Sequence, residues 1–394
     1  MNILIFSSAL VGLSTRTRGG PSIWCENFIN FLRDNGHHVV GLSIGRLAPA
    51  RKIQPLLKQI LYDSANPLSR LWILDPIVFG KMAESFFAAR KATKLCEMHK
   101  IDVIVGTGVH ECSGLYLVDL PAPLIISIRG DYTEEIPIWL SGDPNFDRHK
   151  KMYDVMEFMA LKSSSCVTFV SNWLKSRLAS RPLPKKHFVV PNPLRTYNSA
   201  CDTELDKSIK IPHDKKIIIT ITSFHSLHRL EGFKIFAKAS HIINANDPHV
   251  HFLVLGGSQD QKYFNDVKEL TSGLPITFAG YREDVIQILQ KGDIYLHCSV
   301  LETFSNALIE AMSVGLPCVS TETGGIPEIV SHRVNGMLSD LDPESVAMTV
   351  LELLGNSGLP RILGEAARKS VKENYTWPVL GPGWENILKE ITRK

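Results

Sequence analysis

Two glutamates flank a helix start in the stretch SVLETFSNALIEAMSVGLPCVSTETGGIPEIV, residues 299–330. Glu302 precedes an apolar helical run, and Glu310 falls just over one turn inside it. A helix N-terminus offers unpaired backbone N–H groups and partial positive charge, which suit phosphate, whereas carboxylates accept hydrogen bonds from hydroxyls. The pattern therefore fits a ligand with hydroxyls at both ends and phosphate between them, which is the layout of a nucleotide sugar. Spacing alone favours a simpler interpretation, a capped helix with two solvated glutamates.

The elements that hold these glutamates can be predicted from the same stretch. Ser305 or Asn306 is expected to cap the helix, and Gly315 to close it in a left-handed conformation. Residues 318–321, CVST, predict a short buried strand. Residues 323–330, TGGIPEIV, predict a glycine turn that leads into a second helix.

The whole chain has an ordinary globular composition. It has 394 residues, of which 44% are hydrophobic and 21% charged, and this length is sufficient for two domains. Seven cysteines without a CxxC pair favour a reducing, cytoplasmic location over a disulfide framework. The N-terminal apolar run lacks a preceding basic region and predicts a buried strand, and no stretch has the length of a membrane span. No G-x-G-x-x-G follows the first strand, and neither a P-loop nor a tight His/Cys cluster is present, which argues against a nicotinamide enzyme and a metal site.

Charge is distributed unevenly along the chain. Residues 1–192 contain 23 Lys and Arg against 16 Asp and Glu, a net charge of +7, whereas the remainder contains 20 against 24, a net charge of −4. Cations alternate with large apolar residues at 51–61 and 81–94. One interpretation is a helix on the inner, anionic face of a membrane or against a lipid-linked acceptor. The other, which the pattern favours, is a set of core-facing helices with solvated Lys and Arg.

Short apolar runs alternate with segments of helical period in two series. The first series predicts a domain of residues 1–192 on the acceptor side. The polar stretch CDTELDKSIKIPHDKK predicts a linker, and the second series predicts a nucleotide-sugar-binding domain, residues 193–375. Such alternation predicts an α/β protein with two doubly wound, Rossmann-like domains that face a central cleft. Ligands of such sheets bind at the carboxyl ends of the strands. The expected strands are NILIFSS, HVVGLS, DVIVGTG, LIISIRG, VTFVS and HFVVPN in the first series, and IIITITS, HFLVLGG, ITFAG, IYLHCS and PCVST in the second.

Several longer segments resemble one enzyme family. ETFSNALIE matches an E-x7-E signature, and the segment with the glycine turn that follows is close to the sequence usual in this family. FAGYREDVIQILQKGDIYLHCS, NGMLSDLDPESVAMTVLELL and VVPNPL are similar to family segments around that signature. The chain thus resembles the retaining GT-B glycosyltransferases of group one, glycosyltransferase family four. This resemblance covers most of the chain and is weakest in residues 45–100.

The resemblance implies a role for each matched residue. Glu310 would accept hydrogen bonds from the ribose hydroxyls, and Glu302 would face the hydroxyls of the donor sugar as a catalytic residue. Gly19 and Gly20 would let the backbone of the first domain approach the phosphates. The other donor positions are the turn that would hold the base, Tyr281 and Arg282, and the backbone amides near the diphosphate and sugar, at Phe304, Ser305, Asn306 and Ala307.

Departures from the family pattern fall at charged positions. Ser226 and Glu231 occupy the usual places of an Arg and a Lys that pair with the diphosphate, so that Arg229 is the nearest cation. The simpler alternative for Arg229 is a solvated cation at a helix start. Arg129 replaces the histidine of the first domain, and it could hydrogen-bond donor or acceptor but not act as a base. His110 is a second catalytic candidate, although a lone histidine at a strand end is more often structural.

These observations predict a metal-independent enzyme that moves a hexose-type unit from a nucleotide diphosphate sugar to an acceptor hydroxyl with retention of configuration. The acceptor would be a glycan or lipid-linked molecule in polysaccharide or glycoconjugate biosynthesis, no cofactor beyond the co-substrate would be needed, and no nucleic acid would be bound. The tail, 376–394, would cross back to the first domain, as the resemblance implies. Two alternatives remain, a nucleotide-sugar-binding subunit without catalysis and a GT-B epimerase.

Overall fold

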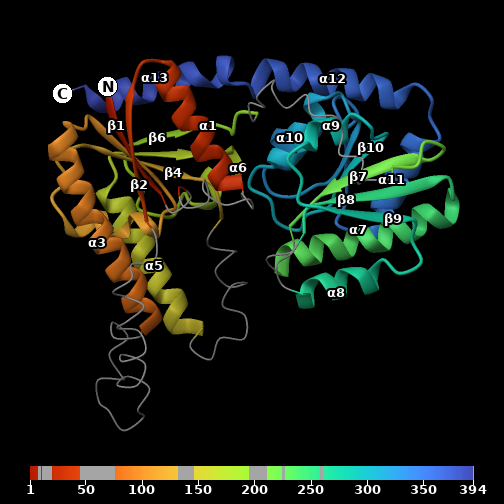
Figure 1. Cartoon of the computed structure of the whole chain (residues 1–394), viewed down its shortest axis with the longest axis horizontal. Coiled ribbons are helices and arrows are strands. Elements are labelled where there is room, and N and C mark those ends of the chain that lie inside the picture. The colour runs from red at the N-terminus through yellow and green to blue at the C-terminus, as the bar shows by residue number, and fades with distance from the viewer. Residues whose placement is uncertain are drawn as a thin grey trace, which may run out of the picture. The chain divides into compact units, whose positions relative to one another are not determined.

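The chain forms two units, each built around one parallel sheet, in the computed structural model shown in Figure 1. Unit 1 consists of residues 1–190 and 381–394, and unit 2 of residues 191–380. The last segment of the chain therefore belongs to the unit that the first segment begins. The structure describes residues 1–7, 10, 20–44, 76–131, 146–194, 211–223, 227–257 and 261–393.

Unit 1 contains a six-stranded parallel sheet with the strand order β2-β1-β3-β4-β5-β6. Its central strands are buried almost throughout, because helices cover both faces of such a sheet. This burial explains why they read as continuous apolar runs. The strands are β1 (Asn2–Ser7), β2 (His38–Ser43), β3 (Val103–Thr107), β4 (Leu124–Ile128), β5 (Cys166–Phe169) and β6 (Lys186–Val189).

Helices connect these strands, and the C-terminal helix packs among them. Helix α1 ends at Asp34, and Gly36 follows with φ of +79°, as a left-handed stop. Trp384, from the last segment, is fully buried beside Trp24 and Phe28 of α1. The helices of unit 1 are α1 (Gly20–Asp34), α3 (Pro76–His99), the 3₁₀ helix η4 (Glu111–Leu117), α5 (Phe146–Ser163), α6 (Asn172–Arg177) and the part of α13 (Trp377–Thr392) from residue 381 onward.

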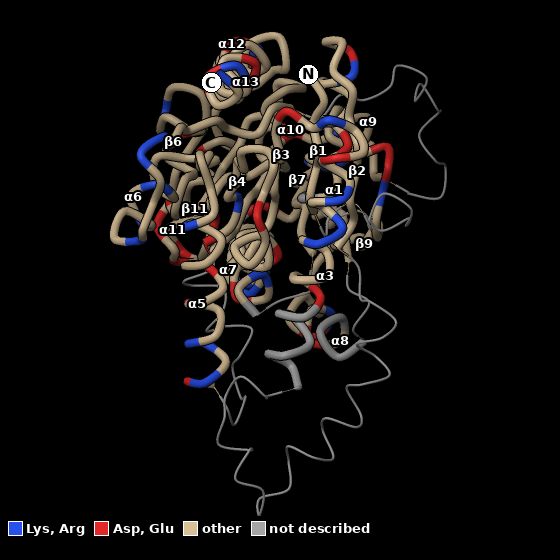
Figure 2. The backbone as a smooth tube through the Cα atoms, turned by 90° about the vertical axis from the view of Figure 1, so that its left-hand side faces the viewer, with Lys and Arg blue, Asp and Glu red and all other residues tan. Residues whose placement is uncertain are grey.

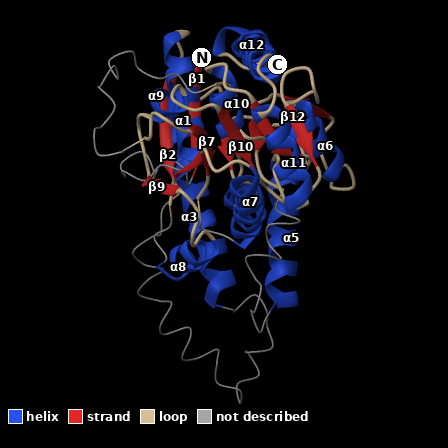
Figure 3. Cartoon of the chain, turned by 90° about the vertical axis from the view of Figure 1, so that its right-hand side faces the viewer, coloured by secondary structure: helices blue, strands red, loops and turns tan. Residues whose placement is uncertain are grey.

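Unit 2 contains a second six-stranded parallel sheet, with the order β12-β11-β10-β7-β8-β9. Figure 3 shows strands β7, β10 and β12 in red among the helices α7, α10 and α11. The strands are β7 (Lys216–Ile221), β8 (Val250–Leu255), β9 (Ile276–Gly280), β10 (Ile294–His297), β11 (Cys318–Thr321) and β12 (Met337–Ser339). The helices are α7 (Leu227–Asn246), α8 (Gln261–Leu270), α9 (Val285–Leu289), α10 (Asn306–Ser313), the 3₁₀ turn η6 (Ile326–Glu328), α11 (Pro343–Leu354) and α12 (Leu359–Asn374).

The core of unit 2 lies where α7 and α11 cover the sheet. Phe236 packs edge-to-face on Phe252 of β8, and both side chains are buried. Gly232 permits α7 to approach the backbone that follows β10, because a Cβ there would meet the Cys298 carbonyl oxygen. This close approach fixes the start of α7 against the loop that carries Glu302.

The predicted α/β architecture of two doubly wound parallel sheets is confirmed, and each expected strand is present. One local prediction was wrong. Residues 323–330 lead only into the three-residue 3₁₀ turn η6, not into a second helix. The helix cannot continue, because the Ser331 amide donates to the Asn335 side chain and the chain turns through Arg333 at φ of +62° toward β12. The cationic segment at 51–61 lies outside the described residues.

Candidate active site

The carboxyl edge of the second sheet collects glycines and polar side chains from four neighbouring strands. Gly256 follows β8 with φ of +102°, and a Cβ there would clash with the Thr222 carbonyl oxygen after β7. The Gly256 amide also donates to the carbonyl of Gly280, at the end of β9. The backbones after β7, β8 and β9 are therefore drawn close together at the edge where ligands of doubly wound sheets bind.

A glycine turn holds the loop between β10 and α10, which carries Glu302. The Gly325 amide donates to the Glu302 carbonyl at 2.9 Å, and the Thr323 hydroxyl donates to the Val300 carbonyl at 3.1 Å. Gly324 has φ of +55°, and a Cβ at this position would clash with the Glu302 carbonyl oxygen. Gly324 and Gly325, which follow both glutamates in the sequence, thus position Glu302.

The Glu302 carboxylate is buried and charged. Arg229 Nη1 lies 2.9 Å from Glu302 Oε2, and His297 Nε2 lies 3.6 Å from the same oxygen. Burial acts to raise the pKa of Glu302, but the Arg229 guanidinium and His297 outweigh it and lower the pKa to about 2. Glu302 is therefore an anion at neutral pH, and the contacts from Arg229 and His297 converge on one of its two oxygens. The interpretation of Glu302 as a solvated glutamate is wrong, since the residue is only 7% exposed.

Arg229 lies in the first turn of α7 and donates to Glu302, so the alternative of a solvated cation is also wrong. Its side chain remains 33% exposed. Glu231, in the place of the family lysine, pairs instead with Lys234 on the surface of the same helix at 2.7 Å. That Arg229 replaces the family's diphosphate-binding cations stays a prediction.

The start of α10 is capped as expected. The Ser305 hydroxyl accepts a hydrogen bond from the Leu308 amide at 3.2 Å, so Ser305 and not Asn306 is the N-cap. Asn306 instead accepts, through its side-chain oxygen, a hydrogen bond from Asn192 at 2.9 Å. Phe304 is buried against the Tyr375 ring. Asn306, Ala307 and Glu310 are partly exposed along the first turns of α10, where a ligand could reach them.

The turn after β9 carries Tyr281 and Arg282. Tyr281 is exposed, and Arg282 forms a forked ion pair with Asp284, with Nε–Oδ1 of 2.7 Å and Nη2–Oδ2 of 2.6 Å. Strand β9 lies at the sheet edge, with β7 and β8 between it and β10. At about 4.8 Å per strand, the turn is roughly 14 Å from the Glu302 loop. This separation suits the two ends of an extended ligand.

In unit 1, Arg129 lies directly after β4 and stacks on α1. Its guanidinium carbon is 3.5 Å from the centroid of the Trp24 ring. Burial lowers the pKa of Arg129 to about 9, although the nearby Cys25 acts in the opposite direction. Arg129 thus remains a cation at neutral pH. The Cys25 thiol contacts the hydroxyls of Ser7 and Thr107, at the ends of β1 and β3.

His110 is buried at the start of η4, with its ring edge-on to Tyr153 at 4.9 Å between centroids. Its catalytic role stays a prediction. Gly20 is the first residue of α1, and Gly19 lies outside the described residues. The residues predicted for the first domain therefore fall in unit 1 and the remaining candidates in unit 2.

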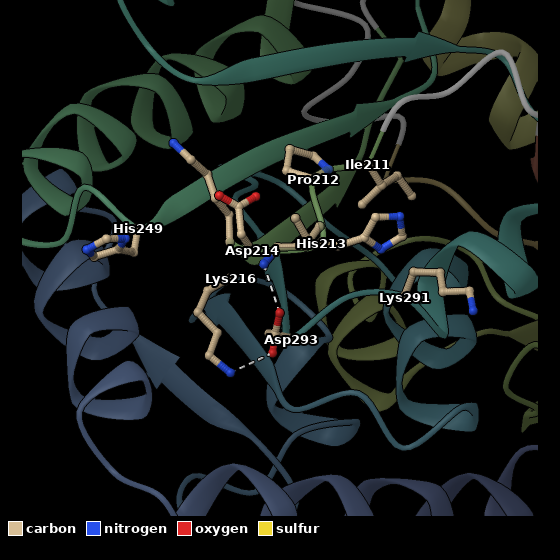
Figure 4. A pocket seen from close by; sticks show the side chains of 10 residues that line it. Ile211, Pro212, His213, Asp214, Lys216, His249, Lys291 and Asp293 are labelled. Atoms are coloured by element: carbon tan, nitrogen blue, oxygen red, sulfur yellow. Dashed lines mark hydrogen bonds and ion pairs between the residues drawn. The ribbon is translucent and has the colours of Figure 1, made fainter.

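A depression of about 590 Å³ lies at the opposite, amino edge of the second sheet (Figure 4). Lys216, the first residue of β7, pairs there with Asp293 at 3.0 Å, while His213 and Lys291 extend along the rim. None of the predicted donor residues lines this depression, so it is not the candidate active site.

Among the described residues, no three His, Cys, Asp or Glu side chains are grouped as a metal site would require. No helix in the described part of the chain is long and apolar enough to cross a membrane.

Sequence reasoning missed two histidines beside Glu302. His297 ends the buried strand β10, and His228 precedes Arg229 in α7. Burial, then the charge of Arg229, lowers the pKa of His228 to about 4, against the opposing effect of Glu302. His297 could have been noticed as a polar residue within the mainly apolar run IYLHCS, whereas nothing in the local sequence pattern marked His228.

Two parallel α/β units, with an anion-bearing loop and a helix start at the carboxyl edge of the second sheet, define the GT-B class of fold. A solved structure supports this assignment, Anabaena HepE in complex with UDP-glucose, which has a TM-score of 0.68 and 17% identity and covers 99% of this chain and 100% of that one. Residues 215–356 match the family model for glycosyl transferases group 1. The second unit is thus similar to the group 1 glycosyltransferases.

The similar proteins differ in how much of the chain they match. N-acetyl-alpha-D-glucosaminyl L-malate synthase of Bacillus anthracis is 32% identical over 238 residues, which are 59% of this chain and 61% of that enzyme. An uncharacterized glycosyltransferase of Methanocaldococcus jannaschii is 26% identical over 397 residues and covers 95% of each chain. The likeness to the second protein thus extends over both units.

Proposed function

We propose that the protein transfers a sugar from a nucleotide diphosphate sugar to an acceptor hydroxyl with retention of configuration. The observation that carries the proposal is the buried, ionised Glu302 directly before α10, with Glu310 on that helix. The crystal structure of HepE, which shares the fold, is a complex with UDP-glucose, so a UDP-sugar is the first donor to test.

The candidate residues at the start of α10, together with Arg229, have defined tasks in this proposal. Glu310 accepts hydrogen bonds from the ribose, and the Glu302 oxygen that does not face Arg229 accepts from the donor sugar. The amides of Asn306 and Ala307 and the guanidinium of Arg229 stabilise charge on the departing diphosphate, an electrostatic contribution. An oxygen of that diphosphate takes the acceptor proton on the face from which the acceptor attacks.

The experiment is a donor screen with purified protein and UDP-, GDP- and ADP-sugars, in which nucleotide release and glycosylated product are both measured. Glu310→Ala should weaken nucleotide diphosphate binding by roughly 1.5–3 kcal/mol, the usual worth of a hydrogen bond to a charged group. Glu302→Gln should reduce turnover more than nucleotide affinity. Glu231→Gln, on the exposed pair of α7, is the matched control and should leave both unchanged.

Other results would select the alternatives. Nucleotide-sugar binding without turnover of any donor would indicate a binding subunit, and a changed sugar without acceptor would indicate an epimerase. Unchanged nucleotide affinity in folded Glu310→Ala would remove the ribose assignment.

A second part of the proposal is peripheral attachment to an anionic membrane, where a lipid-linked acceptor would lie. Helix α3 exposes Phe87, Lys91, Lys94 and Met98 at intervals of three or four residues, so that they share one face, and the exposed Arg90 is three residues from Phe87 and four from Lys94. Apolar and cationic side chains on one helix face are typical of interfacial helices. Figure 2 marks further Lys and Arg in blue on the neighbouring helix α5.

Vesicle sedimentation tests this attachment. Each cation near an anionic leaflet contributes about 1 kcal/mol, and salt screens the attraction over a Debye length of about 8 Å at physiological ionic strength. The protein should therefore sediment with anionic vesicles at low salt and release at high salt. Lys91→Glu with Lys94→Glu should abolish sedimentation, whereas the same charge change on α12, Arg361→Glu with Lys369→Glu, should not. Equal binding to neutral vesicles would exclude this mode of attachment.

A further inference from the structure

His297 is the last residue of β10 and is almost fully buried, at 4% exposure. Its Nε2 atom lies 3.6 Å from Glu302 Oε2, the oxygen that also accepts a hydrogen bond from Arg229. A side chain from a sheet strand and one from a helix thus reach the same carboxylate oxygen from two elements. The strand is held on both sides by its parallel neighbours β7 and β11.

The other ring nitrogen of His297 faces the phenol of Tyr295. The Tyr295 hydroxyl lies 3.5 Å from His297 Nδ1, and the two rings are nearly parallel, at 18°. Burial raises the pKa of Tyr295 well above its ordinary value, so the phenol keeps its proton and can donate it to Nδ1. A histidine that accepts at Nδ1 carries its own proton at Nε2, directed toward Glu302.

We propose that His297 is a positioning residue, which together with Arg229 holds Glu302 Oε2 so that the other oxygen, Oε1, is presented to the donor sugar. The inference rests on the proposed function of this site. A carboxylate held at one oxygen by two elements cannot rotate freely, and its second oxygen keeps a fixed direction. Such fixed geometry is required for a group that stabilises a transition state, where misplacement by about 1 Å can cost on the order of a hundredfold in rate.

Other titratable groups around Glu302 are consistent with this role. His228, on α7, is neutral at physiological pH because its pKa is about 4. Tyr295, on β10, also stays neutral. Among the described groups that face Glu302, Arg229 carries the compensating positive charge, and the buried His297 Nε2, which has no hydrogen-bond partner of its own, faces the same oxygen at 3.6 Å.

Two substitutions separate positioning from structural support. His297→Phe keeps a ring in the buried site but removes the donor, whereas His297→Gln restores an N–H donor. The expected result is a 10- to 100-fold fall in kcat for His297→Phe, with the Kd for the nucleotide diphosphate within about twofold of wild type, and partial recovery of kcat in His297→Gln. His251→Phe is the matched control, because His251 also lies on a strand of this sheet but bonds to Thr277.

A readout that does not depend on turnover completes the test. Carboxyl ¹³C NMR of glutamate-labelled protein, with the Glu302 resonance assigned from Glu302→Gln, should show the titration of Glu302 displaced upward by about one pH unit in His297→Phe. An unchanged titration, or wild-type kcat in His297→Phe, would overturn the inference. A wild-type protein that turns over no donor would remove the proposed function, and the NMR titration would still decide whether His297 holds Glu302.

Discussion

Replacement of Arg229 by Met keeps an unbranched stem at this position but removes the guanidinium charge from the buried Glu302. Hydrogen bonds to charged groups contribute about 1.5–3 kcal/mol, and the partial exposure of Arg229 places this one near the middle, at about 2 kcal/mol. The pKa of Glu302 gives a second measure, for Arg229 and His297 together and net of the opposing effect of burial. A fall from 4.5 to about 2, at about 1.4 kcal/mol for each pH unit, corresponds to roughly 3 kcal/mol at neutral pH.

Glu302→Gln should lower the free energy of unfolding by less than Arg229→Met does, by about 1 kcal/mol. The amide oxygen can still accept a hydrogen bond from Arg229, and the guanidinium can reach water. The double variant, Arg229→Met with Glu302→Gln, should lower the free energy of unfolding by no more than about 2 kcal/mol. Once Arg229 is absent, Glu302 has already lost its partner, so its replacement adds no further loss. A double-mutant cycle from urea unfolding at pH 7 should therefore give a coupling free energy of about 1 kcal/mol.

The exposed pair of Glu231 and Lys234 supplies the control cycle on the same helix. Surface pairs of this kind contribute about 0.2–1 kcal/mol, and the i,i+3 geometry places this one at the lower end. If the cycle on Arg229 and Glu302 gives a coupling as small as the control, the argument that the carboxylate depends on Arg229 for its charge is refuted.

Two further perturbations test other parts of the site. Gly324→Ala should destabilise unit 2 by more than about 2 kcal/mol, because a Cβ would clash with the Glu302 carbonyl, whereas Gly273→Ala, with φ of +81° and open space around it, should cost only about 1 kcal/mol in the same urea titrations. Because the pKa of His228 is about 4 in the folded protein, the unfolded chain binds this proton first as the pH falls below about 6.5. Stability should thus decrease between pH 6.5 and 4, by about 3 kcal/mol from this residue, and thermal unfolding of His228→Asn should show a flatter dependence over that range; an equal slope in both proteins would contradict the assignment.

The strands were predictable because burial on both faces leaves a continuous apolar run such as IIITIT, which no solvent-facing strand shows. Strand β12 was missed because its three residues are too few for a pattern to be recognised. The segment after Gly324 was misread as a helix, since the proline and glutamate that favour a helix start also fit a single 3₁₀ turn. What ended that turn was a side-chain contact from Asn335, which no local rule anticipates.

The candidate site was predictable to a similar depth. The cap at Ser305 and the location of Glu302 before α10 follow from local chemistry, and the structure confirms both. The pairing of Glu302 with Arg229 does not, because the two residues are 73 positions apart and meet only when β7 and β10 lie side by side in the sheet. The contact with His297 likewise depends on the path of the loop after β10. Long-range pairs of this kind set the charge of the site, and the sequence pattern alone does not encode them.

The return of the chain to unit 1 has a consequence for its synthesis. Trp384 fills the space beside Phe28, Gly381 lies against Phe31, and Glu385 pairs with His37 at 2.7 Å. A nascent chain that has left the ribosome up to Val190 therefore lacks part of its own core and must wait for another 190 residues, 191–380, before the missing helix emerges. At 5–20 residues per second this interval is roughly 10–40 seconds, during which the aromatic face of α1 is without its native cover. Expression of unit 1 alone should accordingly require residues 381–394 to be joined to it, and a ribosome-associated chaperone has a defined surface to shield in the meantime.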